Sequence, residues 1–323
     1  MILITGGAGY IGSHVNKMLV LLGYETIIFD NISTGNIEAV KWGKLVVGEL
    51  SDIKALEDVF KKNEISTVIH LAASAYVGES IIYPAKYYNN NVVNTINLLE
   101  CMRKYHIKNL IFSSSCAVYG NSNNAMVSED SCQNPINPYG ASKKMIERII
   151  SDYGKAYGLK YCCLRYFNVA GGDIEGEIGE SHSPETHIIP LVLETAVKKR
   201  KSFSIFGTDY NTNDGTCVRD YVHVSDIALA HIKAVEYLLN NGVSDFFNLA
   251  NGVGYSVKEI IDVATRITNQ DISLNLMERR LGDSAILIGD SSKAKKILQW
   301  VPQYPNIEVM IKHAWYWICN KMF

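Results

Sequence analysis

The chain has 323 residues, of which 47% are hydrophobic and 20% charged, and its formal net charge at pH 7 is −2. That length favours about two domains with a large apolar core, and the near-neutral charge without a basic block argues against a nucleic-acid partner. No apolar run approaches the ~18 residues of a membrane span, and Met1 leads directly into a strand pattern, so we expect neither a membrane partner nor a signal peptide.

The first half alternates short apolar strand patterns with helical patterns. The predicted strands are Ile2–Thr5, Glu25–Asp30, Lys44–Glu49, Thr67–Ala73, Asn109–Ser115 and Lys160–Asn168. The predicted helices are Ile11–Leu22, Ile53–Asn63, Ala85–His106 and Pro138–Tyr157. Repeated strand–helix units of this kind predict an α/β fold with a Rossmann-type, doubly wound parallel sheet.

The second half begins with a glycine-rich and acidic stretch, Gly171–Thr186, which we predict to be a long functional loop. A smaller mixed α/β region follows. Its predicted elements are the helices Ile188–Arg200, Asp226–Leu239, Val257–Thr268, Ser292–Leu298 (capped by Ser291) and Ile307–Cys319, and the strands Phe203–Phe206, Val218–Val224 and Phe246–Asn251. We place a domain boundary near residue 172, with parts of 205–245 returning to the first domain.

A glycine turn follows the first strand directly. Gly6, Gly9 and Gly12 lie between Thr5 and the first predicted helix. Residues without Cβ allow a tight turn and a close backbone approach to a pyrophosphate, which the free N–H groups of the helix N-terminus then bind. Such a turn alone is weak support for dinucleotide binding, because a plain tight turn has the same composition.

Asp30 strengthens that interpretation. It ends the second strand, 18 residues after Gly12, where a carboxylate binds the adenosine ribose hydroxyls of a dinucleotide. Because a carboxylate repels a 2′-phosphate, we predict NAD rather than NADP. The alternative is that Asp30 only caps the turn Asn31–Gly35.

Tyr139 and Lys143 form a Tyr-x-x-x-Lys pair at the start of a helix that Pro138 begins. The four-residue spacing places both side chains on one helical face. A nearby lysine cation favours phenolate, which makes tyrosine a usable base. Ser115 ends a strand at the edge where open α/β sheets bind ligands, and its hydroxyl can relay a proton. Either feature alone fits an ordinary surface; together, behind a dinucleotide turn, they indicate catalysis.

At these residues the chain resembles the extended short-chain dehydrogenase/reductase superfamily, and more closely its UDP-glucose 4-epimerases. The resemblance covers essentially the whole chain. It is carried by Gly6–Gly12, Asp30-Asn31, Ala72-Ala73, Val77–Ser80, Tyr87–Val92, Ser113–Gly120, Asn137–Lys143, Arg165–Gly171, Asp209–Thr212, Asp214–Thr216, Val218–Tyr221 and Arg279–Asp283.

This resemblance implies that the chain is an NAD-dependent isomerase that interconverts UDP-glucose and UDP-galactose through a transient 4-keto sugar. It makes Tyr139 the base, Lys143 its activator and Ser115 the proton relay. The implied cofactor residues are Gly6, Gly9, Tyr10, Ile11, Gly12, Asp30, Asn31, Glu49, Leu50, Leu71, Ala72, Ala73, Asn90, Tyr139, Lys143 and Tyr166. The implied UDP-hexose residues are Ser115, Tyr139, Asn168, His187, Ile188, Arg219, Arg280, Asp283 and Leu287, with both arginines on the phosphates.

The chain departs from the family pattern at Ala75, where many members have lysine, and at Glu49 and Leu71. For Arg219 the alternative is an ion pair with neighbouring Asp220, and for Leu287 a plain core position in the run Ala285–Ile288. If Leu287 instead walls the sugar pocket, its small size would also admit UDP-N-acetylhexosamines.

Two other functions compete. The first is a sugar-nucleotide 4,6-dehydratase or UDP-glucuronate-type enzyme, but those have an acid after the strand-end serine or threonine, where this chain has Cys116-Ala117. The second is a catalytically silent NAD-binding scaffold, which would need neither Tyr139 nor Lys143. By analogy we expect a homodimer. The odd number of cysteines, seven, favours reduced thiols in the cytoplasm, and we predict no metal site.

Overall fold

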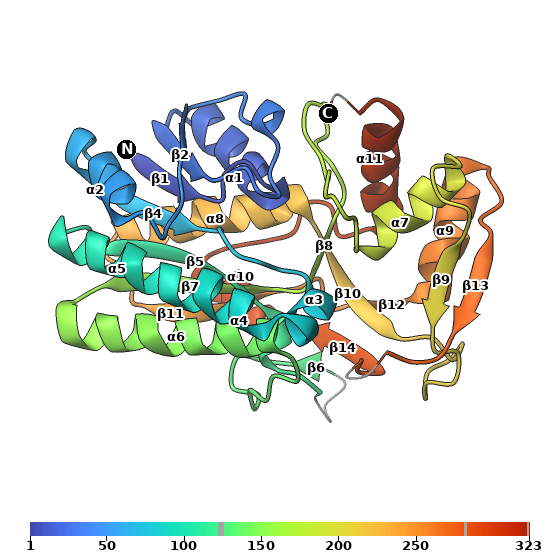
Figure 1. The fold of residues 1–323 in the computed structure, drawn as a ribbon. Helices are drawn as coiled ribbons and strands as arrows, with labels where there is room; N and C mark the ends of the chain where they lie inside the picture. Colours follow the sequence, from blue (N-terminus) through green and yellow to red (C-terminus); the bar gives the residue numbers. More distant parts are fainter. Residues whose placement is uncertain (122–125, 281–282, 322) are drawn as a thin grey trace.

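The computed structural model describes residues 1–121, 126–280, 283–321 and 323. Figure 1 shows a broad part built from helices and a central sheet, with a smaller part beside it that contains α7, α9, α11 and the strands β9 and β13. Within the described residues, no helix is both long and apolar enough to cross a membrane.

A sheet of seven parallel strands forms the centre of the larger part, in the order β11-β7-β5-β4-β1-β2-β3. Its strands are β1 (Ile2–Thr5), β2 (Thr26–Asp30), β3 (Lys44–Val47), β4 (Thr67–His70), β5 (Asn109–Ser115), β7 (Lys160–Tyr166) and β11 (Asp245–Leu249). Every residue of β1, β2 and β4 is buried, as a parallel sheet covered on both faces requires. The predicted Rossmann-type fold is therefore confirmed.

Helices cover both faces of this sheet. α1 and α8 pack together over one face, and α2, α5 and α6 cover the other. Figure 1 shows α5 and α6 side by side along that second face. Their bounds are α1 (Tyr10–Leu21), α2 (Ile53–Lys62), α5 (Asn94–Lys104), α6 (Pro138–Tyr157) and α8 (Val224–Leu239). The sheet is thus the middle layer of three.

The predicted helix Ala85–His106 is not continuous. It consists of α4 (Pro84–Tyr87), a π-helical turn (Tyr88–Val93) and α5, and the unpredicted α3 (Val77–Ile82) precedes it. A π-helical turn inserts one residue into the helical repeat, and such turns gather at functional sites. Here it lies beside the cavity described below.

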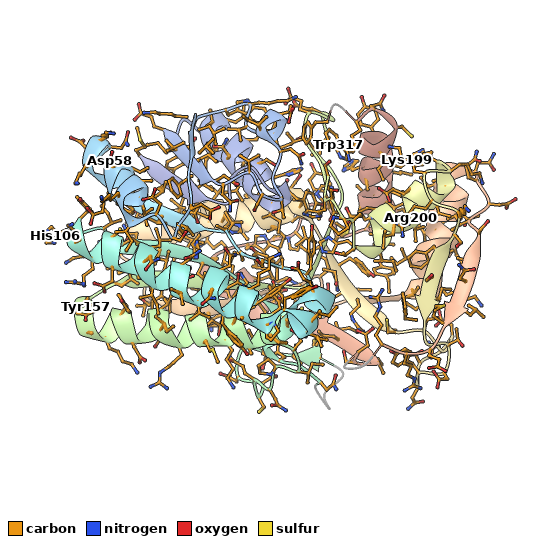
Figure 2. All side chains as sticks on the ribbon, viewed as in Figure 1. Asp58, His106, Tyr157, Lys199, Arg200 and Trp317 are labelled. Atoms are coloured by element: carbon orange, nitrogen blue, oxygen red, sulfur yellow. The ribbon has the colours of Figure 1, made fainter. Side chains whose placement is uncertain are left out.

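The smaller part has its own apolar core, formed where α7, α9 and α11 pack together. This smaller part contains Lys199, Arg200 and Trp317, and it lies at the end of the molecule opposite Asp58, His106 and Tyr157 (Figure 2). Its helices are α7 (Ile188–Ala196), α9 (Val257–Thr268) and α11 (Ile307–Cys319). A two-stranded sheet pairs β9 (Phe203–Phe206) with β13 (Leu274–Met277).

A second group of strands lies between the two parts. It contains β6 (Met126–Val127), β8 (Asn168–Ala170), β10 (Val218–His223), β12 (Gly254–Ser256) and β14 (Ile286–Gly289), and α10 (Ser292–Ile297) follows β14. β10 pairs with β8, β12 and β14. It then leads directly into α8, so the chain returns here to the larger part.

Several predicted bounds differ from the structure. The strands predicted to end at Glu49, Ala73 and Asn168 end at Val47, His70 and Tyr166. The helix after the loop ends at Ala196 and not at Arg200, because Lys198 adopts a left-handed φ of 62°. Ser291 precedes α10 but its hydroxyl donates to the Ala250 carbonyl oxygen and does not cap the helix.

Candidate active site

A cavity of about 710 Å³ opens at the carboxyl ends of the central strands. It is lined by every residue predicted to bind the cofactor, and also by Ser115, Asn168, His187 and Ile188. Parallel strands end at one edge of the sheet, so residues far apart in the sequence converge there. Arg219, Arg280, Asp283 and Leu287 are not among the described residues that line it.

The glycine turn forms one wall of this cavity. Gly6 has a φ of +75°, and a Cβ built on it would lie 2.5 Å from the backbone nitrogen of Ala72. A Cβ on Gly12 would lie 2.2 Å from the carbonyl oxygen of Gly6. Both positions therefore require glycine, the first for its conformation and both for space. The turn presents bare backbone to the cavity at the start of α1, which suits a pyrophosphate.

Asp30 caps the turn that follows it and also lines the cavity. Its Oδ1 accepts a hydrogen bond from the Ile32 N–H at 2.8 Å, which caps the turn, and its Oδ2 accepts from the Ala8 N–H at 2.9 Å. Burial raises the pKa of this carboxyl. A carboxylate has about four lone-pair sites, so two hydroxyl donors can still bind. Beside it, the Asn31 amide donates to Glu49 Oε1 at 3.0 Å, and both residues line the cavity.

Tyr139, Ser115 and Lys143 meet on the cavity's inner wall. Asn137 caps α6 by accepting from the Gly140 N–H, and Pro138 occupies its first turn, so Tyr139 and Lys143 start this helix as predicted. The Lys143 ammonium nitrogen lies 5.8 Å from the Tyr139 ring centre and donates to the Ser113 carbonyl oxygen at 2.7 Å. The Ser115 side chain lies close enough to the Tyr139 phenol to act on its pKa.

The pKa values of this group differ from the sequence expectation. Burial raises the pKa of Tyr139 to about 12, although the hydrogen bond to Ser115 opposes the shift. Burial also lowers the pKa of Lys143 to about 7, and the charge of Glu147 acts against that change. Desolvation therefore sets the direction of the shift for both groups.

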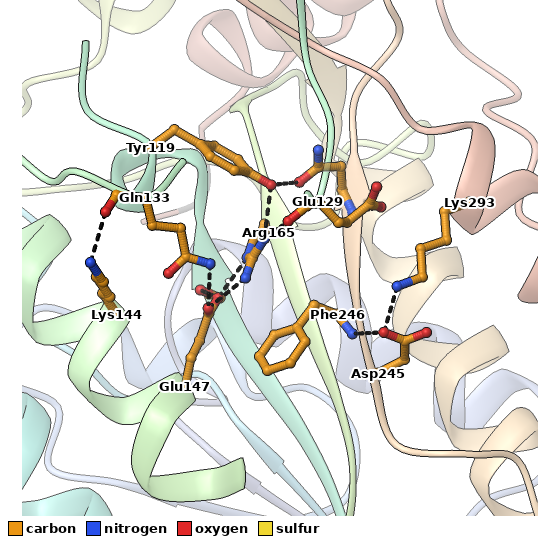
Figure 3. A network of polar contacts seen from close by, with 11 residues as sticks. Tyr119, Glu129, Gln133, Lys144, Glu147, Arg165, Asp245, Phe246 and Lys293 are labelled. Carbon is orange, nitrogen blue, oxygen red and sulfur yellow. Dashed lines mark hydrogen bonds and ion pairs between the residues drawn. The ribbon is translucent and has the colours of Figure 1, made fainter. Parts of the chain in front are cut away.

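A buried ionic network holds α6 against the sheet behind these residues. Arg165 on β7 donates to Glu147 on α6 through Nε at 2.8 Å and through Nη2 at 2.7 Å, and both side chains are 3% exposed. Ser114, next to Ser115, donates to the same carboxylate at 2.6 Å. Figure 3 shows Arg165 also reaching the Tyr119 hydroxyl. Glu147 lies one turn after Lys143, so the network fixes the catalytic face of α6.

Other predicted cofactor residues are placed by side-chain contacts. The π-helical turn brings Asn90 to the cavity, where its amide donates to Ser74 Oγ at 3.1 Å. The Tyr166 hydroxyl donates to Ser113 Oγ, beside the Lys143 contact. The Tyr10 hydroxyl donates to the Gly171 carbonyl oxygen at 2.7 Å and so joins α1 to the long loop.

The loop 171–187 contains neither helix nor strand and supplies the opposite wall. His187 caps the N-terminus of α7 through its backbone, and its Nδ1 is bonded to Glu180 Oε1. His182, which we did not predict, also lines the cavity. Burial lowers the pKa of His182, but the carboxylates of Glu180 and Glu185 outweigh burial and raise this pKa to about 10. The spacing Glu-x-His-x-x-Glu-x-His was the available signal. Tyr76 and Lys86 are further unpredicted lining residues.

The remaining predicted substrate residues lie around β10 and β14. Arg219 pairs with Asp283 at 3.3 Å and not with Asp220, whose carboxylate accepts N–H groups of Asn251 and Gly252. The guanidinium of Arg280 lies 3.8 Å from the Phe206 ring centre. Leu281 and Gly282 fall outside the described residues.

Leu287 is a buried core residue. It belongs to a cluster with Val118, Tyr119, Val127, Phe167 and Ala250. Phe167, and Cys116 packed against the same cluster, line the cavity. Leu287 therefore lies behind the cavity wall and touches it only through other side chains.

Comparison with known proteins gives a consistent result. The family model for GDP-mannose 4,6 dehydratase matches residues 3–313. The UDP-glucose 4-epimerase of Halalkalibacterium halodurans is 47% identical, over 98% of this chain and 95% of that protein. Among solved structures, the UDP-glucose 4-epimerase of Brucella ovis in complex with NAD has a TM-score of 0.95 at 45% identity and 97% coverage of both chains. The UDP-Glc/GlcNAc 4-epimerase of Campylobacter jejuni has a TM-score of 0.86 at 40% identity, covering 99% of both chains.

Proposed function

The chain belongs to the UDP-glucose 4-epimerases of the extended short-chain dehydrogenase/reductase superfamily, and we propose that it interconverts UDP-glucose and UDP-galactose in the cavity described above. It is an NAD-dependent isomerase. The observation that carries the proposal is the convergence of Tyr139, Ser115 and Lys143 with the glycine turn on a single cavity.

The residues of the cavity fit NAD. The bare backbone at Gly6 and Gly12 leaves room for a pyrophosphate, and Asp30 retains free lone pairs for the ribose hydroxyls. Bound there, NAD would supply the oxidation and subsequent reduction at C4 of the sugar. A carboxylate at Asp30 disfavours the 2′-phosphate of NADP.

The proton step belongs to Tyr139. Its phenolate oxygen takes the proton of the sugar 4-hydroxyl, directly or through the nearby Ser115 hydroxyl, and returns it after the sugar has rotated to present its opposite face. Lys143 lies on the same helical face, and in its protonated form it would stabilise the phenolate. The Arg165–Glu147 pair keeps that face against the ends of β5 and β7.

The UDP-hexose would lie along the loop wall, with Asn168, His187 and Ile188 at its side. The N-terminus of α7 begins there and offers N–H groups to a phosphate. We retain Arg219 and Arg280 as phosphate ligands of the bound state. Each would exchange its present partner, Asp283 or the Phe206 ring, for the diphosphate.

We propose residues 1–172 as the NAD-binding domain and 173–323 as the UDP-sugar-binding domain, with part of 205–245 returning to the first. The position of α8 and β11 in the larger part supports such a return.

We also propose a cytoplasmic homodimer. Exposed apolar side chains occur on α3, on the π-helical turn and on α6, including Ile81, Ile82, Val93 and Met145. A surface of this kind favours a protein partner, and an isologous pairing of these helices would cover it. All seven cysteines are free, which suits a reducing compartment.

The 4,6-dehydratase alternative deserves a direct test because the matching family model bears that description. Elimination requires an acid beside the strand-end serine, and the cavity is lined there by Cys116 and Ala117. Incubation of the purified protein with UDP-galactose, followed by chromatography of the products, should give UDP-glucose without consumption of added NAD. A dehydrated sugar, or unchanged UDP-galactose, would contradict the proposed function.

A further inference from the structure

The loop wall holds a cluster of four metal-ligating side chains that the proposed mechanism does not use as a group. Glu180, His182, Glu185 and His187 each offer one ligand atom, and these atoms all lie within 4.8 Å of one another. The Glu180 and Glu185 side chains are only 5% and 6% exposed. Two carboxylates buried so close together require compensating positive charge.

The spacing of His182 from its two carboxylate neighbours matches a tetrahedral ion, whereas His187 Nδ1 lies closer to Glu180 Oε1 than two ligands of one ion do and would have to move apart from it on binding. His182 Nδ1 lies 3.2 Å from Glu180 Oε1 and 3.6 Å from Glu185 Oε2. At metal–ligand distances of about 2.0–2.2 Å, two ligands of a tetrahedral zinc ion are about 3.3–3.6 Å apart. Two imidazole nitrogens and two carboxylate oxygens also form a donor set that suits zinc better than magnesium or calcium.

His182 Nδ1 adds an independent observation. This nitrogen is fully buried, yet it makes no hydrogen bond of acceptable geometry despite its two carboxylate neighbours. The nitrogen is close to two carboxylates but aligned with neither. Ligand atoms that all point at a common metal centre are arranged in this way.

The surrounding contacts hold the ligands in place. Oε1 of Glu185 accepts the backbone N–H groups of Thr186 at 2.7 Å and His187 at 2.9 Å, which leaves Oε2 for the cluster. The Trp317 indole N–H donates to the Glu180 carbonyl oxygen at 2.9 Å. Partners of this kind orient the ligands of natural metal sites.

We propose that Glu180, His182, Glu185 and His187 bind one divalent transition-metal cation, with Zn²⁺ as the preferred ion. Metal binding requires both imidazoles to be deprotonated, and one dication then balances the two carboxylates in this buried site. The ion joins the long loop to the first residue before α7, and so fixes the loop wall of the cavity.

A second acidic group on the same loop provides the control. Asp173, Glu175 and Glu177 also cluster, but the Lys17 ammonium lies 2.8, 2.6 and 2.7 Å from their carboxylates and already compensates them. This group has no imidazole, so it should not bind zinc with comparable affinity.

The test is calorimetric titration of zinc sulfate into the full chain after treatment with EDTA and dialysis. We expect one ion per chain in the wild type. Loss of an outer partner of a metal site costs about 10–100-fold in affinity, so loss of a ligand in His182→Gln or Glu185→Gln should cost at least about 100-fold. Glu175→Gln should bind zinc as the wild type does.

Two further measurements keep the outcome clear if a variant folds poorly. Cobalt bound to the wild type should show the intense visible absorption of a tetrahedral site, and zinc should raise the thermal midpoint of the wild type but not of the ligand variants. Absence of stoichiometric zinc binding, undiminished binding in both ligand variants, or the weak spectrum of octahedral cobalt would each overturn the proposal. None of these readouts involves turnover, so their failure leaves the epimerase proposal intact.

Discussion

The two walls of the cavity are held in different ways. On the sheet wall, Ser115, Tyr139 and the glycine turn sit at ends of strands and helices, and backbone pairing sets their positions. On the loop wall, residues 171–187 do not pair with any strand. Their position depends on contacts of side chains such as Tyr10, Glu180 and Trp317. In the proposed function, the chemistry belongs to the wall that backbone pairing positions, and sugar binding to the wall that side-chain contacts position.

The largest effect should follow removal of the base on the sheet wall. Tyr139→Phe deletes one hydroxyl, and we expect the epimerisation rate to fall by roughly 10²–10⁴-fold, as for other lost acid–base groups. Tyr153→Phe is the matched control, because Tyr153 lies on the same helix and donates only to Glu100 at 2.6 Å. Similar rates for the two variants would move the chemistry away from this wall.

The sheet wall can be destabilised through the buried ionic network between α6 and β7. Arg165→Met leaves the buried Glu147 carboxylate without its cation, which should lower the free energy of unfolding by about 3–5 kcal/mol. Urea denaturation measures this loss. Arg148→Met, which removes an exposed pair with Asp152 on the same helix, should change stability little. An equally small loss in Arg165→Met would show that the network does not hold α6. If the loss is large, adding Glu147→Leu should recover much of the lost stability, because the unpaired buried carboxylate is removed.

Lys143 makes both the stability of the fold and the rate of turnover depend on pH. Its folded pKa of about 7 lies below the ordinary 10.5, so the unfolded chain binds the proton more tightly and folding is penalised as pH falls through that window. Lys143→Met should therefore raise the thermal midpoint at pH 7. Loss of the cation should also shift the pH optimum of turnover upward by about 1–3 units, the usual effect of a neighbouring charge. An unchanged pH profile would exclude Lys143 as the activator of Tyr139.

The smallest effect concerns the sugar side of the cavity. We expect UDP-N-acetylglucosamine to be accepted less efficiently than UDP-galactose. Leu287→Tyr should push the adjoining Phe167 toward the sugar, reduce turnover of the acetylated sugar relative to UDP-galactose, and cost about 1–3 kcal/mol through overpacking. Ile286→Tyr, on the same strand but not in that core cluster, is the control. An equal activity ratio in both variants would show that Leu287 is only a core residue.

The sheet wall could be predicted because its signals are local. The glycine turn, Asp30 at a strand end and Tyr-x-x-x-Lys after Asn-Pro each depend on a few neighbouring residues, and all line the cavity. The bounds of α6 and α9 were predicted to the residue for the same reason: Pro138 and Ser256 mark their starts, and Gly158 and Asn269 end them in left-handed conformations.

The contacts of the predicted substrate residues outside the cavity lining could not be predicted in the same way. Arg219, Arg280 and Leu287 were assigned by resemblance, and their contacts with Asp283, Phe206 and Phe167 depend on packing between distant segments. The π-helical turn left no periodic signal, because one inserted residue barely alters the apolar pattern. The Lys143 and Tyr139 pKa values were misjudged because burial depth follows from the whole fold.

The position of β11 has a consequence for the newly made chain. A ribosome that has released residues 1–172 has produced six of the seven strands of the central sheet, but β7 still presents an unpaired edge. The α8 helix that covers one face of β5 and β7 is also still to come. An uncovered apolar sheet with a free edge invites misassembly. The catalytic half of this protein therefore depends for its completion on residues 224–249, and the order of synthesis delays the finished sheet until they emerge.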